Sequence, residues 1–439
     1  MSHRRQLPER PDLLAVHRLD PDTWPFLLDS ASQGGGLGRW SMLMRADPAH
    51  APIVSSPAAS EEFLPRLDRA YSAERRAQPG ALPFEGGWFV YLGYELVGEI
   101  EPKLELLEVP DGTPRAFAMR CNAAVVVDHE TGAAHAVAET AELLTQIERE
   151  AMGAGALVDA PANLALPEMR ADDGERFMLG VQRIRDYILA GDVFQVNLSR
   201  AWLGLAETAP EPVDVYRALA AANPAPFAGL ARLPGGTLLS SSPERLVSVH
   251  GRRIEARPIA GTRPRGTSPA LDQALSTELL AHPKERAEHI MLIDLVRNDL
   301  GRICAAGSVE VDELMSVESY AHVHHIVSNV RGRLRDEVSP AGIVRACFPG
   351  GTITGCPKVR CMEIIAELET TGRGFYTGSM GYLGLDGRMD LNILIRSMLV
   401  TDRGIRFRTG AGIVADSEPA AELAETEAKA RGLMRALNP

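Results

Sequence analysis

The chain has 439 residues, of which 45% are apolar and 24% are charged, and its formal net charge is -12. This composition is typical of a globular protein, and the length allows two subdomains or one large intertwined domain. The acidic balance, without a basic run interleaved with aromatic residues, argues against a nucleic-acid-binding surface. Because no stretch approaches about 18 consecutive apolar residues, we expect no membrane span.

The beginning of the chain and its cysteines indicate a cytoplasmic protein. The first ten residues are polar and no apolar segment follows them, so we expect no signal peptide. The five cysteines are scattered, and no pair has the spacing of a zinc or redox motif. Reduced thiols are the simplest interpretation, and these persist in the cytoplasm.

Residues 1–165 form a predicted N-terminal region of short β-like segments closed by one helix. The expected strands are 40–44, 88–92 and 123–127, and the expected helix is 139–152. Residues 153–173 are rich in Ala with scattered Gly and Pro, which predicts a linker or a surface crossing.

Residues 170–439 form the second predicted region, where strands and helices follow one another without regular alternation. An apolar stripe at Phe177, Val181 and Ile184 predicts a helix over 174–190. The other expected helices are 271–281, 283–300, 340–347, 357–369 and 418–437. The expected strands are 193–201, 236–241, 246–249, 254–259, 378–383, 391–400 and 405–408. This order of elements predicts an α+β fold with mostly antiparallel sheets.

Two pairs of glutamates lie on predicted helices. Glu285 and Glu288 are three residues apart, as are Glu422 and Glu425, so each pair projects from one side of its helix. Such pairs suit a divalent cation with an anionic ligand over it, and Mg²⁺ is the natural candidate because it takes oxygen ligands and keeps positions for water and substrate. The alternative is that both pairs are solvated helix faces.

Two segments rich in glycine have features of anion sites. Residues 348–358 form a glycine-rich turn into a helix that is predicted to begin with Pro357, and helix starts attract anions. In the second segment, Gly410 to Gly412 would let the backbone approach a carboxylate closely. A purely structural turn is the alternative for the first segment, and a bulge or tight bend for the second.

These segments together resemble the chorismate-utilising enzymes, which include anthranilate synthase component I, aminodeoxychorismate synthase component I, and the isochorismate and salicylate synthases. The resemblance covers about residues 174–437 in unbroken order, and the first region more weakly. It implies an α+β fold in which two mostly antiparallel sheets pack together, with helices outside and the site in a cleft.

The resemblance also implies a metal site. Glu288 and Glu425 match the two Mg²⁺ ligands of the family, and Glu285 and Glu422 match residues that support the metal and its waters. The Mg²⁺ would hold the ring carboxylate of chorismate, and Lys429 would lie near that carboxylate.

The remaining contacts to chorismate follow from the same resemblance. Tyr376 and Arg396 match binders of the enolpyruvyl carboxylate, assisted by the backbone at Gly410, Ala411 and Gly412. An acidic protein needs such local cations to hold an acidic ligand.

Three further residues match positions around the ring. Glu244 matches the general acid that protonates the departing C4 hydroxyl, a step that requires a proton donor. Thr352 and His325 match positions that line the ring. A lone histidine is more often structural, and in the doublet of His324 and His325 only one side chain can face a site from a strand.

Gln195 and Ala260 separate the members of the family. Isochorismate and salicylate synthases carry a lysine at the position of Gln195 as the base that activates water, so glutamine favours ammonia as the nucleophile. Residues 196–199 and 348–352 look more like aminodeoxychorismate synthase. Ala260 favours anthranilate synthase, because many aminodeoxychorismate synthases have a lysine there that adds to ring C2 before ammonia adds at C4.

The resemblance implies two further partners. The chain has no cysteine in a nucleophile-elbow context, so ammonia is expected from a separate glutamine amidotransferase subunit. The segment that contains Leu28 and Ser30 is similar to the one that binds tryptophan in anthranilate synthases. Tryptophan would be a structural ligand or a regulator there, and in the extreme alternative the chain is a non-catalytic sensor.

Overall fold

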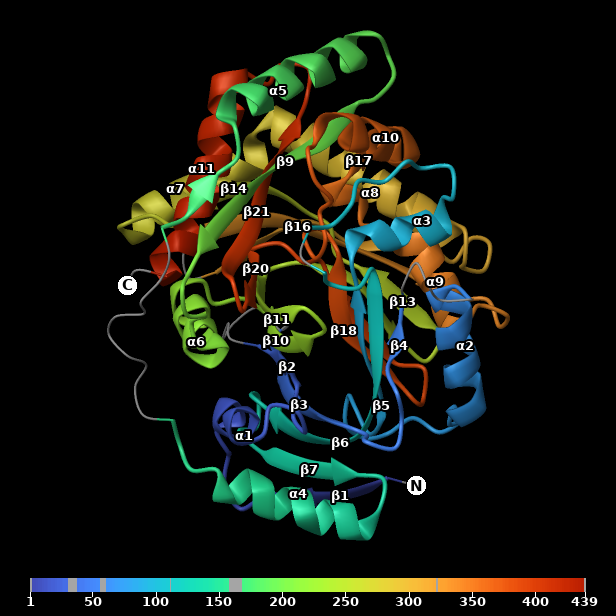
Figure 1. Ribbon diagram of the computed structural model, residues 1–439. Coiled ribbons are helices and arrows are strands. Elements are labelled where there is room, and N and C mark those ends of the chain that lie inside the picture. The colour runs from blue at the N-terminus through green and yellow to red at the C-terminus, as the bar shows by residue number, and fades with distance from the viewer. Residues whose placement is uncertain are drawn as a thin grey trace.

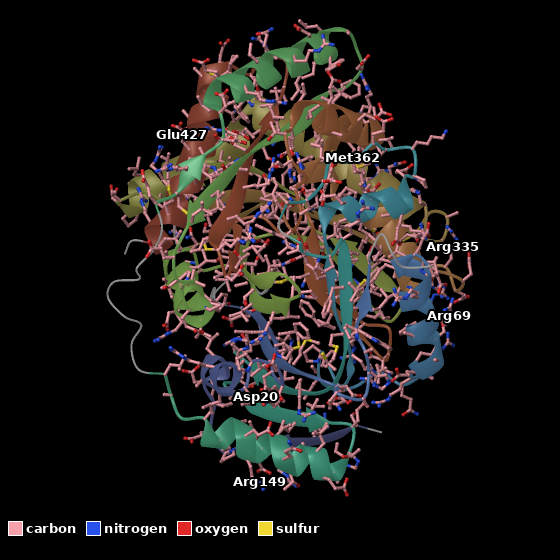
Figure 2. All side chains as sticks on the ribbon, in the orientation of Figure 1. Asp20, Arg69, Arg149, Arg335, Met362 and Glu427 are labelled. Atoms are coloured by element: carbon pink, nitrogen blue, oxygen red, sulfur yellow. The ribbon has the colours of Figure 1, made fainter. Side chains whose placement is uncertain are left out.

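The computed structural model describes residues 2–30, 38–55, 61–110, 112–157, 168–320 and 323–437. Figure 1 shows strands in the interior and helices around them, with the N-terminal elements at the bottom and right of the view. Charged side chains such as Arg69 and Arg149 project from the outer helices (Figure 2). Among the described residues, no helix is both long and apolar enough to cross a membrane.

The described strands form one hydrogen-bonded network with two arms that meet at the long strand β6 (Ala116–Asp128). The carboxyl-terminal half of β6 pairs with β3 (Trp40–Ala46) and β7 (Ala134–Ala138), and its amino-terminal half pairs with β5 (Gly87–Leu92). Every described strand pairing in both arms is antiparallel.

The first arm contains strands from both predicted regions. Its order is β7 (Ala134–Ala138), β6, β3 (Trp40–Ala46), β2 (Phe26–Asp29), β10 (Phe227–Leu233), β11 (Gly236–Ser242), β20 (Ser397–Thr401), β21 (Gly404–Ile413) and β9 (Gln195–Leu205). Short strands extend its ends, namely β1 (His3–Gln6), β8 (Arg170–Ala171) and β17 (Gly355–Cys356).

The second arm leaves β6 through β5. Its order is β5 (Gly87–Leu92), β18 (Ser379–Gly384), β19 (Met389–Asn392), β12 (Arg245–His250), β13 (Arg253–Ala256) and β16 (Val323–Arg333), which also pairs with β14 (Ile259–Pro264) and β15 (Glu310–Ser319). The short strand β4 (Ile53–Val54) pairs with β6.

The two arms pack face to face through an apolar core. Phe26 of the first arm stacks on Phe89 of the second, with ring centroids 4.0 Å apart. Buried residues of β3, β10 and β11 join residues of β5 and β18 in the same cluster. The predicted α+β fold of two packed, mostly antiparallel sheets is therefore confirmed, with the addition that β6 joins the two sheets.

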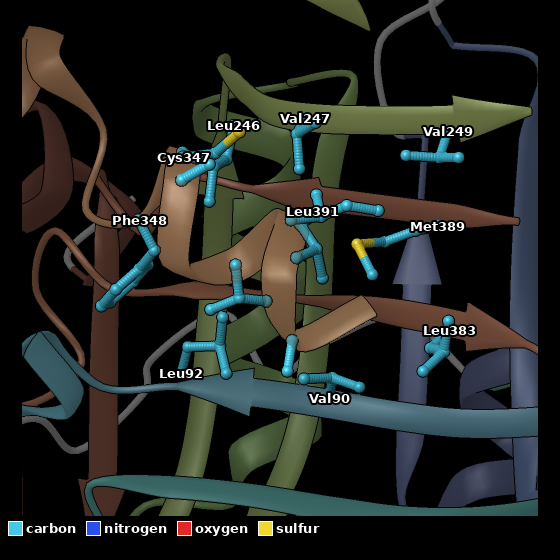
Figure 3. Packing of buried hydrophobic residues seen from close by; sticks show 14 of the residues in the cluster. Val90, Leu92, Leu246, Val247, Val249, Cys347, Phe348, Leu383, Met389 and Leu391 are labelled. Carbon is cyan, nitrogen blue, oxygen red and sulfur yellow. The ribbon is translucent and has the colours of Figure 1, made fainter. Parts of the chain in front are cut away.

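Helices cover the outer faces of both arms. Over the first arm lie α1 (Leu13–Leu19), α4 (Ala141–Gly153), α6 (Pro212–Ala222) and α11 (Pro419–Leu437). Over the second lie α2 (Phe63–Glu74), α8 (Pro283–Gly301) and α9 (Pro340–Cys347). Figure 3 shows the second layer, where Val90, Leu383 and Leu391 face the end of α9 and Phe348. Further helices are α3 (Val97–Ile100), α5 (Gly174–Leu189), α7 (Pro269–Ala281) and α10 (Lys358–Leu368).

Both predicted sequence regions contribute strands to both arms. Leu28 of β2 is paired with Gly229 of β10, and Tyr91 of β5 is paired with Met380 of β18. The predicted boundary near residue 165 lies among residues 158–167, which are outside the described residues, and the division into two regions stays a prediction.

Three sequence predictions are wrong in detail. The expected strand 391–400 is two strands, because Arg396 adopts a left-handed backbone with φ of 50° between them. The expected strand 254–259 is also split, at Pro258, whose nitrogen has no hydrogen to donate. Pro357 has an extended backbone with ψ of 139° and precedes α10, so it is the N-cap residue and not the first helical residue.

Candidate active site

The site lies where strands β9 and β21 meet helices α8 and α11. Gln195 begins β9, and its Nε2 donates to Glu288 Oε1 of α8 at 2.8 Å. A Cβ at Gly412 would lie 2.4 Å from Gln195 Nε2, so glycine is required for this side chain to reach α8. Within the described residues, the other amide atom, Gln195 Oε1, is buried and has no hydrogen-bond partner. Gln195 Oε1 is therefore an unused hydrogen-bond acceptor beside α8, as far as the described residues show.

In the predicted acidic pairs on α8 and α11, the charge of one glutamate adds to the rise in the pKa of another. Burial raises the pKa of Glu288, and the charges of Glu285 and Glu425 raise it further, while the Gln195 amide opposes them. Burial also raises the pKa of Glu422, with Glu425 adding to the effect. The structure therefore brings together glutamates that are far apart in sequence, and their carboxylates repel one another.

These carboxylates suit a divalent cation that takes its other ligands from water and substrate. In the described ranges, no group of three or more His, Cys, Asp and Glu side chains is placed to enclose a metal ion. Glu288 and Glu425 offer carboxylate oxygens, the ligand type that Mg²⁺ prefers. Burial is the main cause of the raised pKa of Glu288, and a cation would offset the charges of Glu285 and Glu425 that add to it. The residues thus fit Mg²⁺ with water and a substrate carboxylate as further ligands.

Cations balance the rim of this acidic cluster. Lys429 Nζ lies 2.7 Å from Glu425 Oε1 and donates to the carbonyl of Gly410 at 2.9 Å. Glu285 receives a bond from Arg263 Nη1 at 3.1 Å. Glu285 and Glu425 therefore each have a cationic partner before any metal is added, which the sequence did not indicate.

Tyr376 and the strand β21 form the next wall of the site. A Cβ at Gly410 would lie 2.7 Å from the Tyr376 hydroxyl, so that hydroxyl rests against the β21 backbone. Burial raises the pKa of Tyr376 to about 12, and the charge of Glu425 adds to the effect. The predicted cluster of Tyr376, Gly410, Ala411, Gly412 and Lys429 is therefore brought together, with Ala411 fully buried.

Glu244 occupies a buried position between β11 and β12. Its Oε1 accepts a bond from the Thr352 hydroxyl at 2.8 Å, and its backbone N–H donates to Ser242 Oγ at 3.2 Å. Burial raises the pKa of Glu244 to about 7, although Thr352 and the charge of Arg396 oppose this rise. A carboxyl with this pKa is protonated in a large fraction of molecules at neutral pH, where an ordinary glutamate is ionised, so it can deliver a proton as a general acid must.

Arg396 and His325 complete the wall that faces Glu244. Burial lowers the pKa of Arg396, with Glu244 opposing it. Burial lowers the pKa of His325 to about 4, and the charge of Arg396 lowers it further, so the imidazole is neutral at pH 7. His325 Nδ1 lies 3.0 Å from Thr262 Oγ1, and within the described residues its Nε2 has no partner. The other histidine of the doublet, His324, instead bonds Ser319 and Asp272.

Ala260 lies on β14 opposite Ile326 and is 7% exposed. Its neighbour Gly261 is close to the acidic cluster, because a Cβ there would lie 3.0 Å from Glu285 Oε2. Ala260 therefore lies at the edge of the site, where its side chain is a methyl group.

The segment predicted to bind tryptophan lines a separate cavity. Leu28 and Ser30 border a cavity of about 100 Å³ between the two arms, together with Pro226, Met380 and Asn392. Ser30 Oγ lies within hydrogen-bond distance of the Trp40 carbonyl, at 2.9 Å, and of the Pro226 carbonyl, at 3.1 Å. The two predicted residues are thus brought together at a hollow, away from Glu288.

A buried charge network behind Tyr376 was not predicted from the sequence. Glu369 Oε1 bonds Arg373 Nη2 at 2.7 Å, and Glu369 Oε2 bonds Arg408 Nη2 at 2.9 Å. All three side chains are at most 2% exposed. The spacing of four residues between Glu369 and Arg373 is visible in the sequence, whereas the pairing of Glu369 with Arg408 depends on the tertiary fold.

Comparison with known proteins defines the class of protein to which this chain belongs. The family of chorismate binding enzymes matches residues 27–435, and the chain belongs to this family. Within it, the chain is similar to anthranilate synthase and aminodeoxychorismate synthase components, and relatives of both names are found.

Three relatives illustrate this similarity. Anthranilate synthase component 1 of Streptomyces coelicolor is 39% identical over 95% of this chain and 84% of that protein. Aminodeoxychorismate synthase component 1 of Bacillus subtilis is 42% identical over 81% of this chain and 77% of that protein. The crystal structure of anthranilate synthase component I from Streptococcus pneumoniae has a TM-score of 0.81 and 32% identity, and covers 91% of this chain and 93% of that one.

Proposed function

We propose that this chorismate-binding enzyme is component I of aminodeoxychorismate synthase, which replaces the C4 hydroxyl of chorismate with an amino group. The observation that carries the aminating chemistry is Gln195, whose amide bonds Glu288 and leaves Oε1 as a buried acceptor. A glutamine side chain has no basic nitrogen with which to activate water. Its free acceptor suits ammonia, which needs no deprotonation to attack.

Glu244 is the proposed acid for the first step. Its proton goes to the C4 hydroxyl, the C–O bond breaks, and water leaves. The Thr352 hydroxyl then stabilises the carboxylate that remains. Neutral His325 lines the ring without adding a second positive charge beside Arg396. The nitrogen of ammonia forms its bond to C4 as water departs with the electrons of the C4–O bond. The proton that the new ammonium group loses then balances the one that Glu244 gave.

The two carboxylates of chorismate have separate proposed partners. Arg396 and Tyr376 bind the enolpyruvyl carboxylate, supported by the β21 backbone at Gly410. Glu288 and Glu425 hold the proposed Mg²⁺, with Glu422 beside them. When bound, Mg²⁺ supplies a Lewis acid for the ring carboxylate and supports charge that develops in the ring.

The proposal includes a partner, a pathway and a compartment. Ammonia would come from a separate glutamine amidotransferase subunit, and the product would serve 4-aminobenzoate and folate synthesis. All five cysteines are unpaired, which supports the cytoplasmic location proposed from the sequence.

Anthranilate synthase component I is the second candidate, and Ala260 is the observation that favours it. Ala260 has no amine that could add to ring C2. If the chain is an aminodeoxychorismate synthase, ammonia would therefore have to reach C4 without a covalent bond between the protein and the ring. Several relatives carry the name anthranilate synthase component 1, which also supports this candidate. Ammonia would then add at C2, and pyruvate would be eliminated.

We also propose that tryptophan binds the cavity bordered by Leu28 and Ser30, as a structural ligand or a regulator. Calorimetry with tryptophan tests this, and Ser30→Ala is expected to weaken binding while it leaves the KM for chorismate unchanged. Equal binding by the wild-type protein and the variant would contradict the assignment.

The activity itself is tested with purified protein, chorismate, Mg²⁺ and an ammonium salt, with no other enzyme present. We expect a non-fluorescent product that retains the enolpyruvyl group and that a lyase converts to 4-aminobenzoate. Fluorescent anthranilate with released pyruvate would contradict the first proposal and support the second.

A further inference from the structure

The turn that presents Tyr376 connects α10 to β18 and is held at several points. Within the turn, Tyr376 N–H donates to the Arg373 carbonyl at 3.1 Å, and Gly378 N–H donates to the Phe375 carbonyl at 2.9 Å. Thr377 follows with a left-handed φ of 60°, and its N–H donates to the Leu394 carbonyl at 2.8 Å. The direction of the Tyr376 side chain therefore depends on where the backbone of residues 373–377 is anchored.

Further hydrogen bonds to this turn come from a residue that is far away in the sequence. Glu95, 278 residues from Arg373 in sequence, accepts the Arg373 N–H on Oε1 at 2.6 Å. Its Oε2 accepts the Gly374 N–H at 3.0 Å. In return, Tyr94 N–H donates to the Gly374 carbonyl at 2.8 Å. Figure 1 shows how this contact arises, because β5, which leads to Glu95, lies beside β18, which follows the turn.

Glu95 holds this backbone and is not the main ionic partner of Arg373. The Arg373 guanidinium bonds Glu369 and also the Asn197 carbonyl, at 2.7 Å. Glu95 is only 2% exposed, and both of its oxygens are used on main-chain N–H groups. Burying a carboxyl group is costly, and here the two main-chain hydrogen bonds offset that cost.

We propose that Glu95 is a positioning residue for the reaction, which acts through the backbone of Arg373 and Gly374 to hold the Tyr376 hydroxyl against Gly410. The inference rests on the proposed function in one respect, namely that Tyr376 contacts a carboxylate of chorismate. It adds a residue of the predicted N-terminal region, outside the expected site, to the machinery that binds substrate.

The charge of Glu95 follows from its surroundings. Burial raises its pKa to about 7, although the backbone bonds and the charge of Arg373 oppose this. Among the described residues, the ionisable groups beside this pocket also include Glu369, Cys361 and the hydroxyl of Tyr94. Burial raises the pKa of the Tyr94 hydroxyl and of the Cys361 thiol, so both stay neutral at pH 7. Only the carboxylate form accepts both N–H groups without a competing proton, so the turn is held more firmly as pH rises through 7.

The test compares Glu95→Gln with a matched control, Glu99→Gln. Glu99 also uses both oxygens on successive backbone groups, the N–H of Phe63 at 2.8 Å and of Leu64 at 3.2 Å, but these begin α2. An amide can accept only one of the two bonds at either position. We expect Glu95→Gln to raise the KM for chorismate about tenfold with kcat changed less than about threefold, because one charged hydrogen bond is lost. Glu99→Gln should leave the KM unchanged.

A double-mutant cycle with Tyr376→Phe shows whether Glu95 acts through Tyr376. In the Tyr376→Phe background, Glu95→Gln should raise the KM by less than about twofold, since the hydroxyl that it positions is already gone. A full tenfold increase in that background, or equal KM values for the Glu95→Gln and Glu99→Gln variants, would overturn the proposal.

A second variant and the pH dependence of the KM also test the role of Glu95. If Glu95→Gln does not fold, Glu95→Asp keeps the charge but shortens the reach, and the same KM increase is expected. The KM of the wild type should also fall as pH rises through 7, and this change should be smaller in Glu95→Gln, which cannot ionise at that position; an equal change in both proteins would contradict the role. Because the assay follows the loss of chorismate, it is independent of which product forms. An anthranilate product would therefore refute the proposed function and leave the role of Glu95 to be decided by the KM values.

Discussion

The bond between Thr352 and Glu244 sets the pH range in which the proposed acid keeps its proton. The Thr352 hydroxyl donates to Glu244 Oε1 at 2.8 Å and favours the charged carboxylate, so it works against the burial that raises the pKa to about 7. Thr352→Val removes this donor and keeps the shape of the side chain. The pKa of Glu244 should therefore rise.

The size of this rise follows from the hydrogen bond. A bond to a charged acceptor contributes about 1.5 to 3 kcal/mol, and about 1.4 kcal/mol corresponds to one pKa unit. The pKa of Glu244 should rise by about 1 to 2, from about 7 to about 8 or 9. An acid is active below its pKa, so the alkaline loss of kcat/KM should move to higher pH by the same amount.

The assay is kcat/KM for chorismate between pH 6 and 10, at saturating Mg²⁺ and with a constant concentration of free ammonia. Thr354→Val is the control, because Thr354 Oγ1 donates to the Gly350 carbonyl at 2.9 Å in the same segment and does not bond Glu244. Its alkaline limb should stay in place. An alkaline limb that is unmoved, or moved to lower pH, in Thr352→Val would refute the assignment of Glu244 as the acid.

Other predictions concern Glu244 itself and the acidic cluster. Glu244→Gln should lower kcat about 10²- to 10⁴-fold. The same change should raise the melting temperature at pH 8 but not at pH 4, because the folded pKa lies above the ordinary 4.5 and ionisation between these values costs stability. Glu288→Gln and Glu425→Gln should each raise the half-saturating Mg²⁺ concentration at least tenfold in titrations of activity. Glu278→Gln should not, because Glu278 lies on α7 with an exposed side chain 3.3 Å from Arg263 Nε. Gln195→Leu removes the bond that lowers the pKa of Glu288, so its Mg²⁺ titration should weaken more steeply below pH 6 than that of the wild type.

Local signals explain which elements could be predicted. The helix 340–347 was predicted with its observed bounds, because Ser339 caps it and Pro340 occupies the first turn. The hairpin of β15 and β16 was missed, since β15 alternates charged and apolar residues that also suit a solvated segment. The break at Arg396 was missed as well, because its left-handed backbone is set by tertiary contacts such as the bond from Ser241 N–H to its carbonyl.

Some features of the candidate site could be predicted from the sequence, and others required the fold. Helical spacing alone predicts that Glu285 and Glu288 share a face, but only the family resemblance indicated that Glu425 would approach them. The raised pKa of Glu244 and the pairing of Gln195 with Glu288 required the fold. The contact of Glu95 with the turn at Arg373 could not be predicted, since no pattern in a sequence shows a side chain that binds a distant backbone.

The position of the new nitrogen in the product distinguishes amination at C4 from amination at C2. The purified chain is incubated with chorismate, Mg²⁺ and ¹⁵N-labelled ammonium, and the nitrogen is located by its couplings in the NMR spectrum of the product. Nitrogen bonded to C4, with the enolpyruvyl group retained, is the predicted result and shows that Ala260 is compatible with amination at C4. Nitrogen bonded to C2 of an aromatic ring, with pyruvate released, would contradict the account.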